Sequence, residues 1–177
     1  ADFKHASELE IIWKSYQWSP DMKTIPGKSI HQYLSEHKRI SLSEATAMNN
    51  QVAGWARQVG LQYNFDIAIP ANTFMAHRFS HLALKYGLQN EAEEKLFCSY
   101  FTEGKNIDDV GTLTQIGTEI GMEAGTVKKV LESEKQSMTH SYVPIFRKPL
   151  TWDYVEFRSL YSTGNLQFQE RRTVKFS

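Results

Sequence analysis

From residue 29 to residue 135 the sequence predicts a series of short helices, and this stretch constrains the fold most. The clearest helix spans 41–60. Ser41 and Glu44 have the spacing of a capping box, in which each side chain satisfies a free amide at the helix start. Apolar residues then recur at steps of three and four, the period of a helix with one buried face. They are Leu42, Ala45, Met48, Val52, Trp55 and Val59. Gly60 is well placed to end the helix in a left-handed turn.

The same stretch holds further helices joined by short loops. The predicted segments are 29–38, 73–86, 90–103, 109–120 and 126–134. Asn72 or Thr73 is expected to cap the helix at 73–86, because short polar side chains accept hydrogen bonds from free amides at helix starts. Asn90 is expected to cap the next helix. The apolar faces predict one common core, in which Trp55, Phe97 and Leu113 are largely buried.

The two ends of the chain have a different pattern. Residues 9–16 form a β-branched and aromatic run and are predicted to be a strand buried on at least one face. Beyond about residue 138, aromatic residues and partial alternation predict a hairpin around the turn at 162–165. Leu166, Phe168, Val174 and Phe176 share one parity along this hairpin. Since no other early segment has the pattern to pair with 9–16, we expect the C-terminal segment to contribute a strand to the same sheet.

Composition excludes several classes of function. Twenty basic residues balance twenty acidic ones, so no long-range field would draw nucleic acid or an anionic membrane to the chain. No stretch approaches the roughly 20 apolar residues of a membrane span, and the polar first residues lack the apolar core of a secretory signal. We therefore expect a cytoplasmic protein without nucleic-acid or membrane partners.

His77 and His81 lie four residues apart, the spacing at which two imidazoles on adjacent helical turns could share a zinc ion. Arg78 and Phe79 follow His77, so the glutamate of an HExxH motif is absent, and no third ligand is implied nearby. We therefore interpret the pair as structural or groove-lining residues and expect no metal site.

Cys98 is the one cysteine of the chain, so no disulfide can form within it. It lies beside Phe97 and Phe101 on the apolar side of its helix, where a lone cysteine is usually a small buried hydrophobe. Phosphate-binding, dinucleotide-binding and hydrolase motifs are absent from the sequence. The motifs alone therefore indicate no chemistry.

Three runs of the sequence carry a resemblance to a known family. They are EIIWKSYQ with the SPDM that follows it, NFDIAIPANTFMAHRFSHLALKYG, and EAEEKLFCSYFTEGKNIDDVGTL. Over about residues 1–135 the chain resembles DsbA-like dithiol–disulfide oxidoreductases of the FrnE type, which belong to the thioredoxin superfamily. The resemblance implies an α/β, helix-rich fold, in which an incomplete thioredoxin-like (DsbA-type) sheet is interrupted by an all-helical insertion domain.

The resemblance also implies a division into domains. Residues 1–28 and 136–177 would form a partial thioredoxin-like domain, and residues 29–135 the helical insertion domain. In the family a CPxC motif precedes the position of Ala1, and none occurs in these 177 residues. One thiol cannot cycle between a dithiol and an internal disulfide. No catalytic residue is therefore assigned in this chain, and its status as an enzyme stays open.

A substrate site is implied as well. In relatives the start of the helix at 73–86 lies over the cleft between the two domains, so Asn72, Phe74, His77 and His81 are expected to bind substrate. Pro144, in a stretch similar to the family's VPFF-like segment, would be the cis-proline that faces the active cysteines. The implied partner is a protein or small-molecule thiol or disulfide. No cofactor is implied, and formation of a homodimer stays open.

Two other functions stay open at this point. The first is a glutathione-dependent isomerase or transferase on the same scaffold, in which serine replaces the nucleophilic cysteine. The second is a non-catalytic helical interaction domain, which predicts no deep cleft beside residues 72–81. Oxidoreductase or disulfide isomerase chemistry remains the leading hypothesis, because it follows from the family that the three runs resemble.

Overall fold

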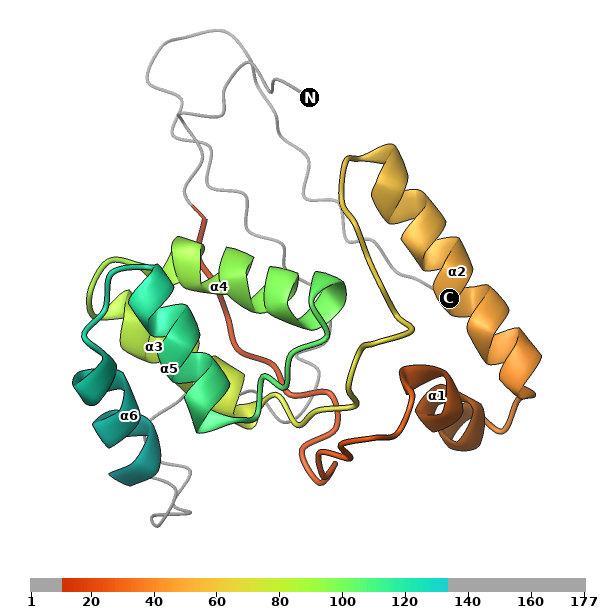
Figure 1. Ribbon diagram of the computed structural model, residues 1–177, viewed down its shortest axis with the longest axis horizontal. Helices are drawn as coiled ribbons and strands as arrows, with labels where there is room; N and C mark the ends of the chain where they lie inside the picture. The colour runs from red at the N-terminus through yellow and green to blue at the C-terminus, as the bar shows by residue number, and fades with distance from the viewer. Residues whose placement is uncertain (1–10, 134–177) are drawn as a thin grey trace, which may run out of the picture.

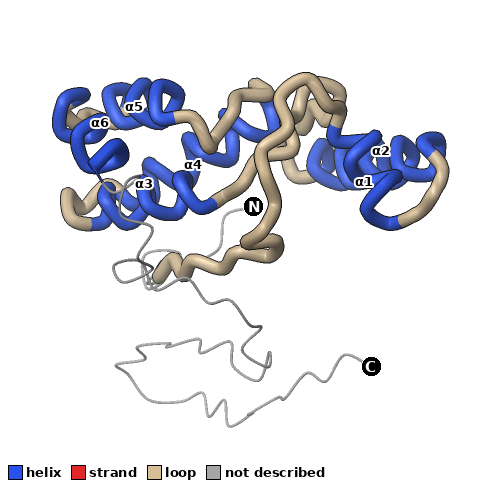
Figure 2. The backbone as a smooth tube through the Cα atoms, turned by 90° about the horizontal axis from the view of Figure 1, so that it is seen from below, coloured by secondary structure: helices blue, strands red, loops and turns tan. Residues whose placement is uncertain are grey.

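The computed structural model describes residues 11–133, which contain six α-helices and one short π-helix. The α-helices are α1 (Ile30–Lys38), α2 (Leu42–Gln58), α3 (Phe74–Leu84), α4 (Gln89–Phe97), α5 (Val110–Glu119) and α6 (Ala124–Ser133). The π-helix η2 (Cys98–Thr102) continues α4. Figure 1 shows α3–α6 as one bundle with α1 and α2 beside it, and Figure 2 shows the same two groups from below. None of the described helices is long and apolar enough to span a membrane.

Helix α3 is the centre of the bundle. It packs against α4, α5 and α6, and seven of its eleven residues are buried, so it has little surface that faces solvent. Phe79 is fully buried at this centre, as are Leu113 of α5 and Val127 of α6. Gly117 lets the helices approach closely, because a Cβ atom there would lie 2.9 Å from Cγ2 of Val127. The predicted burial of Leu113 is confirmed.

The predicted helices are all present, and most of their predicted ends are correct. Ser29 and Ser41 both form capping boxes at the starts of α1 and α2. Gly60 has a φ of 84°, the left-handed conformation expected just after α2. Thr73 occupies the N-cap position of α3 without a side-chain hydrogen bond, and Oδ1 of Asn72, one residue earlier, accepts a hydrogen bond from the amide of Phe74 at 2.8 Å.

Asn90 does not cap α4, so that prediction is wrong. The helix begins at Gln89, which places Asn90 inside its first turn. Its Oδ1 accepts a hydrogen bond from Nε1 of Trp13 at 2.6 Å instead. The side chain that resembled a cap therefore fastens the N-terminal segment to the bundle.

The predicted burial of Trp55 is also wrong, because its side chain is 58% exposed. Among the described helices α2 contacts α1 alone. The residues of α2 that this contact buries are small: Ala45, Asn49, Ala53 and Ala56. The larger apolar residues lie on the adjoining strip of the helix and stay open to solvent.

Phe97 and Cys98 are exposed, contrary to the prediction. Phe97 is 45% exposed and packs at the edge of the bundle, with its ring centroid 6.0 Å from that of Trp13. Leu96 takes the core position of this turn. The π-helix that begins at Cys98 has a wider turn than an α-helix, and its buried residue is Ser99. Cys98 is therefore turned to the surface.

The predicted strand at 9–16 is not seen in the part of the chain that the structure describes. Residues 11–15 have no regular structure, and Tyr16 is a single bridge residue. The prediction is wrong for 11–15, since side chains of this segment bond to α3 and α4. Residues 9 and 10, the hairpin after residue 162 and Pro144 lie outside the described residues. The helix-rich part of the predicted fold class is observed.

Candidate functional site

An extended segment at residues 13–17 lies across α3 and the start of α4. Oγ of Ser15 and Nε2 of His81 are 2.8 Å apart. Nε2 of Gln17 donates a hydrogen bond to Oδ1 of Asn72 at 2.6 Å. With the Trp13 bond to α4, every second side chain of the segment is fastened to the bundle. Alternate side chains of an extended chain point to the same side, which explains this spacing.

His77 lies one turn before His81 and also meets this segment, through a hydrogen bond with the backbone of Tyr16. That bond favours the protonated ring, so we assign the Tyr16 carbonyl as its acceptor and Nδ1 as its donor. Nε2 of His77 is buried and has no hydrogen-bond partner among the described residues. In the neutral ring this nitrogen is an acceptor.

Both imidazoles are held in the neutral form. Burial lowers the pKa of His77 most, the bond to Tyr16 opposes this shift, and His81 lowers the pKa further. Burial also lowers the pKa of His81, and the charge of Lys14 adds to the shift. Desolvation disfavours a charged imidazole, so each ring offers a neutral nitrogen at neutral pH.

The lowered pKa values predict a pH dependence of stability. A histidine whose pKa is lower in the folded chain than the ordinary value of about 6.5 takes up its proton more readily when unfolded. We therefore expect the free energy of unfolding to be highest above pH 6.5 and to fall as the pH drops toward the folded pKa values. Urea denaturation between pH 7 and pH 5 measures this slope.

The variant His77→Gln isolates the contribution of that histidine. It is expected to flatten the slope between pH 7 and pH 5, since one of the two histidines with a lowered pKa is removed. An unchanged slope in His77→Gln would contradict the assignment of a buried neutral imidazole at this position.

The other predicted site residues lie at the start of α3. The side chain of Asn72 accepts hydrogen bonds from Gln17 and from the amide of Phe74, and its Nδ2 donates to the carbonyl of Met22 at 2.6 Å. It therefore holds the loop before α3 in place. Phe74 is partly buried against the core, and the guanidinium of Arg78 lies 6.0 Å from the centre of its ring.

The close pair of Ser15 and His81 invites comparison with a nucleophile and its base. Ser15 is only 5% exposed, however. A buried hydroxyl cannot meet a substrate without movement of the segment that carries it. We interpret this pair as a tie between the N-terminal segment and α3.

The zinc interpretation of the two histidines gains no support. Nε2 of His81 is occupied by Ser15. Among residues 11–133 no group of three or more side chains of the metal-binding types comes together. Structural zinc sites normally have four ligands and catalytic sites three.

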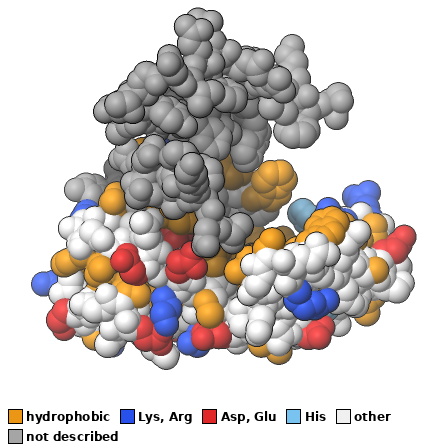
Figure 3. All heavy atoms as spheres, turned by 90° about the horizontal axis from the view of Figure 1, so that it is seen from above, with side chains coloured by type: hydrophobic (Ala, Val, Ile, Leu, Met, Phe, Trp, Pro, Cys, Tyr) orange, Lys and Arg blue, Asp and Glu red, His pale blue; other side chains and the backbone are white. Residues whose placement is uncertain are grey.

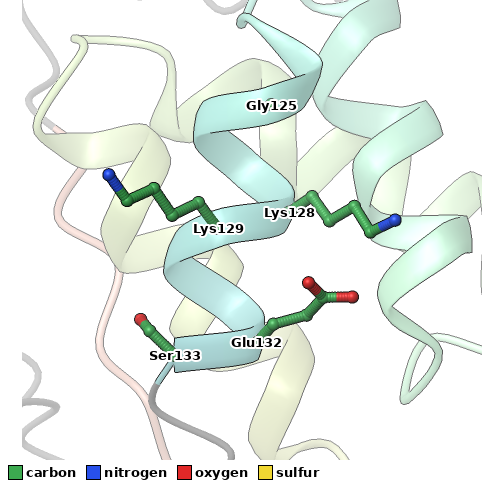
Figure 4. Close-up of a pocket in the computed structure, with 5 residues that line it drawn as sticks. All are labelled: Gly125, Lys128, Lys129, Glu132 and Ser133. Carbon is green, nitrogen blue, oxygen red and sulfur yellow. The ribbon is translucent and has the colours of Figure 1, made fainter.

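An open depression lies elsewhere, on α6, and contains none of the predicted site residues. It is lined by Gly125, Lys128, Lys129, Glu132 and Ser133. Figure 4 shows Lys128 and Lys129 pointing to opposite sides of the helix, so their ammonium groups do not converge. We therefore place the candidate site on α3.

Comparison with known proteins identifies the family. The family described as DSBA-like thioredoxin domain matches residues 2–140. The chain belongs to this family. As a DSBA-like chain it is similar to the uncharacterized protein YwbO of Bacillus subtilis, with 29% identity over 94 residues, which are 49% of this chain and 47% of YwbO. Its resemblance to DsbA-like proteins is thus confirmed at the level of the family.

A solved structure supports the fold of this DSBA-like chain. The structure of a probable DsbA oxidoreductase from Streptomyces coelicolor matches with a TM-score of 0.66 and 19% identity, covering 78% of this chain and 65% of that protein. The chain thus spans about half of one relative and about two thirds of the other.

Sequence reasoning missed three residues that build the site. Trp13 and Ser15 belong to the predicted strand and Gln17 follows it, yet their side chains bond to α4, to α3 and to Asn72 in the loop before α3, respectively. Their shared parity was visible in the sequence. Their partners lie 55 to 77 residues further along the chain, so spacing alone could not identify them.

Proposed function

We propose that this chain supplies the helical, substrate-facing part of a thiol–disulfide oxidoreductase of the FrnE type. The observation that carries the proposal is the pair of neutral imidazoles on α3, of which His77 keeps a buried acceptor nitrogen. In this proposal residues 29–135 form the insertion domain, and 1–28 with 136–177 belong to the thioredoxin-like domain. Membership of the DSBA-like family supports this class of chemistry.

Thiol–disulfide exchange explains why a neutral imidazole is useful there. The attacking group is a thiolate, which forms a new S–S bond while the second sulfur of the old disulfide leaves as a thiolate. A neutral imidazole accepts the proton of the attacking thiol, and the resulting imidazolium stabilises the thiolate. The same proton can return to the leaving sulfur. Nε2 of His77 is an acceptor of the required kind.

The substrate in this proposal is a protein or small molecule that carries a thiol or a disulfide. Cys98 is the one thiol of the 177 residues and lies exposed in η2, away from the histidine pair in the sequence. We therefore assign to His77 and His81 contact with a sulfur-bearing partner once the segment at 13–17, which bonds to both rings, has moved away. To Phe74 we assign apolar contact at the start of the same helix.

The test is binding of a fluorescein-labelled peptide with an internal disulfide, measured by fluorescence anisotropy in a Cys98→Ser background that prevents exchange with the protein. His77→Ala and His81→Ala are each expected to weaken binding about tenfold, which corresponds to about 1.4 kcal/mol. The loss follows from removal of an imidazole that contacts the peptide.

Two controls make the binding result specific. His37→Ala removes an exposed histidine in the last turn of α1 and is expected to leave the affinity unchanged. A peptide with serine in place of both cysteines is expected to bind more weakly than the disulfide peptide. Equal affinity for the two peptides, or an equal loss in His37→Ala, would contradict the proposed function.

A further inference from the structure

Helix α2 and its C-cap residue carry an exposed apolar strip that we call the α2 stripe, formed by Met48, Val52, Trp55 and the C-cap Val59. These side chains are 41%, 39%, 58% and 75% exposed, respectively. Steps of four, three and four residues place them on one side of the helix over about 16 Å. Figure 3 shows hydrophobic side chains gathered on the lobe that α1 and α2 form.

The stripe continues toward the bundle through the loop after α2. Leu61 in this loop is 49% exposed, and Tyr63 stacks on Phe101 of η2 with ring centroids 4.5 Å apart. The ring centroids of Phe101 and Phe97 lie 6.3 Å apart. Tyr63 and Phe101 are half-buried, so the exposed apolar surface that begins at α2 consists of the stripe and Leu61. An exposed apolar surface of this kind usually marks a place where another segment or protein binds.

The size of the stripe favours an occupant from the same chain over a second copy. A stable interface between two proteins takes about 20–30 residues on each side, and the stripe with its continuation offers far fewer. A segment tethered to the same chain needs less surface, because tethering gives it an effective concentration of about millimolar for short flexible links.

We propose that the C-terminal segment 141–177 packs on the α2 stripe, in addition to its place in the thioredoxin-like domain of the proposed function. Residues 141–177 lie beyond the match to the DSBA-like family, which ends at 140. The segment has apolar residues at alternating positions, including Leu166, Phe168, Val174 and Phe176. An extended chain spans about 3.3 Å per residue, so the more than 30 residues that follow α6 can reach α2.

The charges of the two parts are also complementary. Residues 141–177 contain six basic and three acidic residues, whereas residues 61–133 contain ten acidic and six basic residues. The stripe itself carries no charge and adjoins this acidic part through the loop after α2. An apolar segment therefore gains burial on the stripe, and its basic residues are attracted to the acidic part of the chain beyond it.

Photo-crosslinking of the full chain tests the proposal. Trp55 is replaced by the photoreactive residue p-benzoyl-phenylalanine, which keeps an aromatic side chain at an exposed position. The matched control places the same residue at Asn50, which is exposed on the opposite side of α2. Mass spectrometry of the digested product then identifies the crosslinked peptides.

We expect position 55 to crosslink to peptides from 141–177 at least tenfold more than position 50, in a product with the mass of one chain. Adding Val52→Lys and Val59→Lys is expected to reduce this yield several-fold. A product with twice the chain mass would identify a second copy as the occupant and overturn the proposal. Equal yields at positions 55 and 50, crosslinks confined to residues 11–133, or no effect of the two lysines would overturn it as well.

Discussion

Replacing Phe79 with alanine is expected to lower the free energy of unfolding by about 3–5 kcal/mol. The side chain is fully buried in the helix that packs against α4, α5 and α6. Its Cε2 atom would lie only 3.3 Å from a Cβ atom at Gly117, so α5 is already in close contact with the ring. Three packed helices cannot all move into the space, and a cavity remains. Urea denaturation at pH 7 measures the loss.

The matched control for Phe79 lies on the same helix. Leu84 is 53% exposed, and Leu84→Ala is expected to cost less than about 1 kcal/mol, because little apolar surface is buried there. Similar losses in Phe79→Ala and Leu84→Ala would mean that α3 is not the centre of the core.

Replacing Arg78 with methionine is expected to cost about 2–5 kcal/mol, the second largest effect. Arg78 is 5% exposed, and its guanidinium donates hydrogen bonds to the carbonyls of Leu131 and Val130 at 3.3 Å and 3.1 Å. These carbonyls belong to the last turn of α6, and that of Val130 also accepts a hydrogen bond from Oγ of Ser133 at 3.1 Å, so the loss falls mainly on the carbonyl of Leu131. Leaving a buried acceptor unpaired costs about 1–3 kcal/mol. Urea denaturation measures the total.

Two variants separate the hydrogen bonds of Arg78 from its charge. Arg78→Lys keeps the charge but cannot reproduce the planar fork, so it is expected to lose much of the same stability. Lys128→Met removes a positive charge from an exposed position of α6 and is expected to cost little. If Lys128→Met were as destabilising as Arg78→Met, the loss would reflect net charge and not the bonds to α6.

The helices could be predicted from the sequence because their signals are local. The capping box at Ser41 and the recurrence of apolar residues depend on neighbours within a few positions. Gly60, with its left-handed φ, marked the end of α2 in the same way. Local rules of this kind hold wherever the helix packs, so most boundaries were found to within a few residues.

Burial was harder to predict, because it depends on which element covers a face. The apolar period of α2 was correct, but α1 buries the small residues of that helix and leaves Trp55 open. At the end of α4 the π-helix shifts the register, so that Ser99 lies inside and Cys98 outside. A single sequence carries no reliable signal for which helix will cover a given face, or for where a π-helix will form.

Only the part of the candidate site that lies on α3 could be predicted from the sequence. The spacing of His77 and His81 placed both on one side of a helix, and the structure confirms that arrangement of the helix. The other part comes from Ser15, whose partner His81 is 66 residues away. Contacts at that distance depend on how the helices are arranged, which the pattern of a single segment does not contain.

The central claim is that the histidine face of α3 meets the sulfur-bearing substrate. Paramagnetic relaxation tests it most directly, with a nitroxide-labelled disulfide peptide added to the Cys98→Ser chain and the imidazole signals recorded by NMR. The account predicts strong broadening of the His77 and His81 signals, with the His37 signal unchanged. Broadening confined to the amides of Lys128 and Lys129 on α6, with both α3 histidines unaffected, would contradict it.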